Sequence, residues 1–164
     1  MTQGRILVLA LGNDILWDDA VGPLVARALL EDPPDGVDIV ESAESGIRLM
    51  EILTGYDKAL LIDAIQTGAH APGTVIELQA DDFAAVIAPS PHYAGLPECF
   101  AVARNLELPM PQELRILAME VLDPFRIGEG LSESVEEALP QFVEATREAL
   151  NAWLSPAQLT SHTD

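Results

Sequence analysis

Three residues of metal-binding types stand where loops follow apolar segments. Asp19 belongs to an acidic pair that comes after a Gly-Asn turn, Asp63 closes an apolar run, and His92 ends a proline-containing loop segment. Two carboxylates and one imidazole would nearly neutralise a divalent cation and leave coordination positions open for water or substrate. These ligand types do not choose among Ni, Zn, Mn and Fe. We therefore predict a metal site formed by Asp19, Asp63 and His92.

Segments that read as strands and helices alternate around these residues. Continuous runs of Ile, Leu and Val indicate buried strands, whereas apolar residues at helical spacing indicate helices. The alternating run 74–78 is typical of a more exposed or antiparallel strand. The last helix is expected to begin at Ser132 or at Ser134, where Ser134 and Glu137 have capping-box spacing, and to end near Leu154. The expected strands are 6–11, 37–40, 59–62, 74–78 and 114–121, and the other expected helices are 19–30, 46–53 and 96–106.

This order of elements predicts an α/β fold. We expect a three-layer sandwich with a mostly parallel, twisted sheet of about five strands and helices on both faces. The first and third strands of such a sheet end at the same edge, where ligands usually bind. Asp19, Asp63 and His92 should therefore lie within about 10 Å of one another, as one coordination sphere requires. The length of 164 residues predicts one domain over 1–155, followed by a frayed tail over 156–164.

Each candidate ligand also has a structural interpretation. Asp18 or Asp19 could cap the helix that follows, because a side-chain oxygen satisfies free N–H groups there. Asp63 could cap the next loop, and His92 could be an ordinary hydrogen-bonding loop residue. Taken singly, each residue fits these interpretations. Their convergence at one edge of the sheet is what favours the metal site.

Composition and absent motifs disfavour several classes of protein. Eight Lys and Arg against 27 Asp and Glu give a net charge of −19, which argues against nucleic acid or an anionic membrane as partner. No apolar run reaches the length of a membrane span, which is about 18 to 20 residues. The phosphate-binding patterns Gly-x-Gly-x-x-Gly and Gly-x-x-x-x-Gly-Lys are missing, so a nucleotide-binding protein is disfavoured. The single cysteine, Cys99, fits a small buried residue in a reducing compartment, and we expect a cytoplasmic protein.

The motifs around the candidate ligands resemble those of a known family, the hydrogenase maturation endopeptidases. The family's opening pattern is Gly-Asn, a short hydrophobic stretch, Asp followed by Asp or Glu, and a later Gly. Segment 12–22 matches it, with Gly12 first and Gly22 last. The family's mid-chain strand-end aspartate is matched by Asp63, and its Ser/Thr-x-His loop by segment 90–92. The resemblance spans nearly the whole chain, and the three motifs occur in the family's order.

The resemblance implies a function. Family members remove a C-terminal peptide from the large subunit of nickel-iron hydrogenases, so the expected partner is a large-subunit precursor. Asp19, Asp63 and His92 would contact nickel, which the substrate is thought to supply, so that the protease detects whether nickel insertion is complete. We therefore expect an aspartyl-type or metal-dependent endopeptidase. The sequence departs from the family's pattern at one place. Family members usually carry Asp-Gly-Gly after the second strand, whereas this chain has Glu41 and no Gly-Gly there. The role of Glu41 is open.

The catalytic residue is not identified by these patterns. Nickel could polarise the scissile carbonyl or a bound water, or it could only position the substrate while a carboxylate such as Asp18 acts as base. An alternative function is a nickel-checking chaperone that binds a hydrogenase subunit without cutting it. Truncation of the subunit would distinguish the two.

Overall fold

Within the described residues, five strands form one sheet in the order β2-β1-β3-β5-β4. The computed structural model describes residues 4–79, 91–93 and 95–155. The four parallel strands are β1 (Ile6–Leu11), β2 (Val37–Ser42), β3 (Lys58–Ile65) and β5 (Glu113–Glu120). The edge strand β4 (Val75–Gln79) pairs antiparallel with β5. The mostly parallel sheet and its one antiparallel member agree with the sequence-based prediction.

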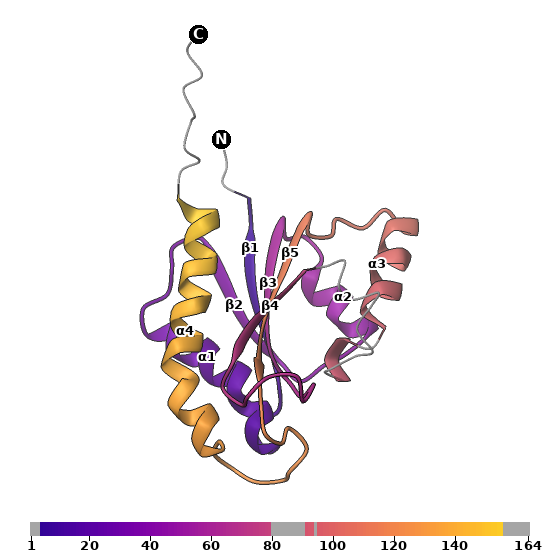
Figure 1. Cartoon of the computed structure of the whole chain (residues 1–164). Coiled ribbons are helices and arrows are strands. Elements are labelled where there is room, and N and C mark those ends of the chain that lie inside the picture. The colour runs from indigo at the N-terminus through magenta and orange to yellow at the C-terminus, as the bar shows by residue number, and fades with distance from the viewer. Residues whose placement is uncertain (1–3, 80–90, 94, 156–164) are drawn as a thin grey trace.

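Helices cover both faces of the sheet (Figure 1). α1 (Val21–Glu31) and α4 (Glu133–Leu154) pack on one face, and α2 (Ile47–Leu53) and α3 (Leu96–Asn105) pack on the other. Two short 3-10 helices, η1 (Trp17–Ala20) and η3 (Pro91–Tyr93), lie beside the sheet's carboxyl edge. The three-layer α/β architecture is therefore confirmed.

The central strands supply the core because they are apolar on both sides. Every residue of β1 is buried, and so is every residue of β3 after Lys58. Successive side chains of a strand point to opposite faces. Val8 and Ile62 accordingly belong to the cluster under α1 and α4, whereas Leu9 and Leu61 belong to the cluster under α2 and α3. Continuous apolar runs are expected in a parallel strand covered on both faces.

Several predicted boundaries differ from the structure, and three of the differences bear on residues singled out in the sequence. The 3-10 turn of η1 delays the start of the first helix from residue 19 to Val21. β3 runs to Ile65, so Asp63 lies inside the strand rather than at its end. The capping box at Ser134 is wrong, because α4 begins at Glu133 after Ser132, with no side-chain hydrogen bond to the helix.

Parts of the chain named in the sequence-based predictions lie outside the described residues. They are the tail 156–164 and residues 88–90 of the loop that leads to His92. Cys99 is buried on α3, as expected for a small core residue, and burial raises the pKa of its thiol. None of the helices in the described part of the chain combines the length and the hydropathy that crossing a bilayer requires.

Candidate metal centre

Asp19, Asp63 and His92 meet at the carboxyl edge of the sheet. They come from η1, β3 and η3, and the exposed fractions of the three residues are 5%, 0% and 6%. One potential ligand atom from each lies within 4.8 Å of those of the other two. Ligand atoms about 2.0–2.2 Å from a first-row ion can be up to about 4.4 Å apart. The group therefore needs only a small contraction to enclose one divalent cation.

The carboxylate of Asp19 is oriented by the turn that follows β1. Its Oδ2 accepts a hydrogen bond of 2.8 Å from the backbone N–H of Asn13. Two glycines allow this packing: a Cβ at Gly12 would collide with the carbonyl oxygen of Asp19, and a Cβ at Gly22 would collide with the carbonyl oxygen of Leu11. The spacing of Gly12 and Gly22 around the acidic pair thus has a steric cause.

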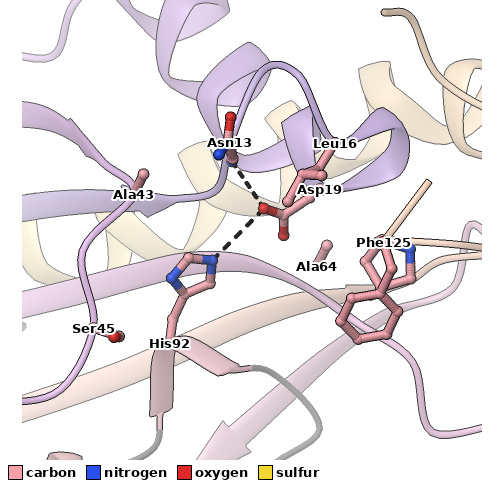
Figure 2. A pocket seen from close by; sticks show the side chains of 9 residues that line it. Asn13, Leu16, Asp19, Ala43, Ser45, Ala64, His92 and Phe125 are labelled. Atoms are coloured by element: carbon pink, nitrogen blue, oxygen red, sulfur yellow. Dashed lines mark hydrogen bonds and ion pairs between the residues drawn. The ribbon is translucent and has the colours of Figure 1, made fainter. Parts of the chain in front are cut away.

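The ring of His92 is held so that one nitrogen faces the carboxylates. Its Nδ1–H donates to the carbonyl oxygen of Glu44 at 3.0 Å, which leaves Nε2 at 3.7 Å from Oδ2 of Asp19 (Figure 2). A histidine that donates from one nitrogen to a carbonyl presents the lone pair of the other to a metal. His92 therefore has the orientation of a metal ligand.

The pKa of His92 reflects its acidic surroundings. Burial alone would lower it, but the Asp19 carboxylate, the charge of Asp63 and the carbonyl of Glu44 outweigh burial and raise the pKa from 6.5 to about 9. In the metal-free protein at neutral pH the imidazole is therefore protonated. A bound divalent cation would take the place of that positive charge.

Asp63 has a neighbour that the sequence patterns did not reveal. Its Oδ1 accepts a 2.8 Å hydrogen bond from the N–H of Ala64. Burial, the charge of Asp63 and a side-chain hydrogen bond to Asp63 raise the pKa of the buried Tyr93 phenol well above 10. Tyr93 is therefore a neutral donor to Asp63. In the sequence, the one signal that Tyr93 belongs to the site was its position directly after His92.

A pocket of about 200 Å³ opens onto Asp19 and His92. Its walls include Asn13, Ala64 and Phe125 (Figure 2). Asp63 is not among the lining residues and lies deeper, fully buried. The arrangement can admit an ion together with part of a ligand while keeping bulk water from most of the carboxylate surface.

Comparison with known proteins decides the family. The sequence model described as hydrogenase maturation protease, HycI, matches residues 23–149. The chain belongs to the hydrogenase maturation protease family. It is 32% identical to the hydrogenase 2 maturation protease of Escherichia coli (strain K12), over 88% of this chain and 92% of that protein.

Solved structures agree with this assignment. The hydrogenase maturating endopeptidase HybD from E. coli superposes with a TM-score of 0.78 and 29% identity, over 90% of this chain and 93% of that one. The [NiFe] hydrogenase maturation protease HybD from Thermococcus kodakarensis gives 0.69 and 26% identity, over 88% and 98% of the two chains. The family and these neighbours make the present chain an endopeptidase.

In this maturation protease, Asp18 has a role different from that of Asp19. Its carboxylate is fully buried and accepts hydrogen bonds from the N–H groups of Leu122, Asp123 and Ser132, and from the hydroxyl of Ser132, at 2.7–3.1 Å. Neither Asp18 nor Asp19 makes a side-chain cap to α1. Asp18 therefore secures the loop 121–132 that joins β5 to α4, and it does not line the pocket.

Glu41, the residue at the protease family's Asp-Gly-Gly position, is paired with a cation. Arg27 contacts its two carboxylate oxygens at 2.9 Å each and reaches Asp14 at 2.6 Å. Both carboxylates raise the pKa of the guanidinium. Glu41 also lines a second cavity, of about 260 Å³, next to Gly12 and Asp14. The three-ligand group does not include it.

Proposed function

We propose that this protease removes the C-terminal propeptide of a nickel-iron hydrogenase large-subunit precursor after nickel has been inserted. In this proposal Asp19, Asp63 and His92 contact the nickel, which arrives as part of the substrate. The observation that carries the proposal is the convergence of one potential ligand atom from each residue within 4.8 Å, in a buried group beside an open pocket.

The donor set suits a transient contact with a metal that another protein already holds. Two carboxylates and an imidazole supply part of a coordination sphere and leave positions for ligands of the precursor. Each donor is also oriented without an ion: Asn13 binds Asp19, Ala64 binds Asp63, and Glu44 binds His92. A preformed group of this kind can favour a nickel-loaded precursor over an empty one, which offers the carboxylates no metal ion.

The proposal assigns no separate catalytic residue. Nickel seated in this group would lie beside the pocket, where it could polarise the scissile carbonyl or a water, or hold the substrate in position. Asp18 is a poor candidate for the base, because both of its oxygens accept hydrogen bonds within the fold. A chaperone without protease activity is not favoured, because the relatives are proteases and endopeptidases.

Processing of a large-subunit precursor tests the proposal. We expect the wild-type protein to truncate nickel-loaded precursor, seen as a mobility change on a gel, and to leave metal-free precursor uncut. Asp19→Asn, Asp63→Asn and His92→Ala should each abolish truncation, because each removes a ligand charge or donor. Asp35→Asn is the matched control, since Asp35 is exposed in the turn before β2. Equal cutting of metal-free precursor would contradict nickel recognition.

A further inference from the structure

Large apolar side chains are exposed on two loops at the mouth of the site. Among the described residues, eight large hydrophobic residues are exposed by more than a third, and four of them lie in segments 13–16 and 121–132. They include Ile15, which is 60% exposed, Phe125, which is 64% exposed, and Ile127, which is 81% exposed. We refer to Ile15, Phe125 and Ile127 as the apolar rim. A cluster of this kind on a protein surface commonly marks an interaction site.

The apolar rim stands on a rigid support. Gly128 donates its N–H to the carbonyl of Ile15 at 2.9 Å and accepts from the N–H of Trp17 at 3.0 Å, which ties the two loops together. The guanidinium of Arg126 lies 4.5 Å from the centre of the Trp17 ring. The exposure of these side chains therefore does not result from a loose loop.

Two carboxylates hold the second loop from within. Asp18 binds three of its backbone N–H groups. Asp123 accepts from the N–H groups of Phe125 and Arg126 at 2.9 and 3.1 Å. A loop ordered in advance loses little conformational entropy when a partner binds, which is the property expected of a binding surface.

The rim continues into the pocket of the metal group. Phe125 and its neighbour Pro124 line the same pocket as Asp19 and His92, and Leu16, next to Ile15, lines it from the other loop (Figure 2). The pocket, at about 200 Å³, holds only a small part of a protein. A precursor that places its nickel against Asp19 and His92 must therefore extend beyond the pocket, past Phe125, toward the loops that carry Ile15 and Ile127.

We propose that the apolar rim docks an uncharged, apolar segment of the large-subunit precursor next to the bond that is cut. This rests on the proposed function and adds a recognition surface outside the metal group. Apolar contact suits this partner because the rim side chains offer no polar atoms and lose water when they are covered. The proposal also gives Asp18 a purpose in the protease, since its hydrogen bonds hold one of the two loops that present the rim.

Steady-state processing of nickel-loaded precursor by the full-length protein tests the docking surface. The double variant Ile15→Ser, Ile127→Ser changes two exposed side chains that do not line the pocket. We expect KM to rise about tenfold or more, with kcat changed by less than about twofold, because interface anchors contribute to binding rather than to the chemical step. Thermal unfolding should be nearly unchanged, as is usual for surface substitutions.

The matched control is Leu30→Ser, Leu106→Ser. Leu30 and Leu106 are exposed to similar degrees, 54% and 61%, at the ends of α1 and α3 remote from the metal group. The KM of this control variant should equal that of the wild type.

Three outcomes would contradict the docking proposal. If the rim variant has the wild-type KM, docking at the rim is wrong while the proposed function stands. If sedimentation shows that the rim variant dissociates a wild-type dimer without changing KM, the rim joins copies of this chain. If the wild type cuts no nickel-loaded precursor, the proposed function fails and the docking proposal fails with it.

Discussion

The adjacent carboxylates of Asp18 and Asp19 serve different parts of the protein. Asp18 is fully buried and accepts hydrogen bonds from Leu122, Asp123 and Ser132, more than 100 residues away in sequence. Asp19 instead binds the N–H of Asn13 and faces His92 at 3.7 Å across the pocket. The acidic pair therefore couples a loop anchor to a potential metal ligand, and the two residues should respond differently to the same substitution.

The substitution Asp18→Asn should destabilise the protein. An asparagine keeps one acceptor oxygen and places an NH₂ group against N–H and O–H donors, so buried donors lose their partner. We expect a loss of about 2–3 kcal/mol in the free energy of unfolding, more than the roughly 1 kcal/mol of a lost helix cap. Urea unfolding measures it, with Asp35→Asn as the exposed control. A loss no larger than that of the control would mean that Asp18 does not anchor the loop.

The substitution Asp19→Asn should lower the pKa of His92 and, with it, the stability that protonated His92 contributes at neutral pH. The asparagine Oδ1 can still accept the hydrogen bond of Asn13, but the negative charge facing His92 is gone. Because Asp19 is one cause of the raised pKa of His92, that pKa should fall from about 9 toward its ordinary value. An NMR titration of the imidazole in the wild type and the variant measures the change. An unchanged pKa would mean that Asp19 does not interact with His92 in solution.

The pH dependence of the metal-free protein follows from the same group. His92 has a pKa of about 9 when folded, against 6.5 ordinarily, so its protonated form stabilises the fold. This contribution is fully present below about pH 6.5 and is lost as the pH rises through about 9. Denaturant unfolding between pH 6 and pH 10 should show it in the wild type. The His92→Ala variant should lack it, and a parallel loss in that variant would assign the effect to other groups.

Metal binding should show the opposite pH dependence. A cation requires neutral His92, so it must displace a proton wherever the imidazole is charged. The affinity of the isolated protein for nickel should therefore rise by up to about tenfold per pH unit below about pH 9. Calorimetric titrations at pH 7 and pH 8 test this, and buffers with different ionisation enthalpies should reveal the released proton. An affinity independent of pH would contradict ligation by His92.

The fold and the group of three residues could be predicted from the sequence because each depends on a simple pattern. Continuous apolar runs indicated the central strands, and in a parallel sheet the loops after them share one edge. That rule brought Asp19, Asp63 and His92 together in the prediction, as they are in the structure. Their role as metal ligands stays a prediction.

Contacts between distant segments could not be predicted in this way. The position of Asp18 before a helix suggested a cap, whereas its partners come from the loop 121–132. The Ser134 capping box was wrong because α4 begins at Glu133, directly after Ser132, which places Ser134 inside the helix. The partner of Tyr93 and the exposure of Phe125 also depend on tertiary packing, and no local pattern encodes them.

The isolated protein should be folded without metal. Its core consists of apolar clusters on both sides of the sheet, and Asp19, Asp63 and His92 each have a partner within the protein. A chelator should therefore leave the melting temperature nearly unchanged, unlike a structural zinc domain whose folding depends on its ion. Added nickel should stabilise the wild type by mass action, by about 1.4 kcal/mol at ten times Kd. The Asp63→Asn variant should lose this gain. A large drop in melting temperature on chelation would instead identify a resident structural ion, and nickel would then not need to arrive with the substrate.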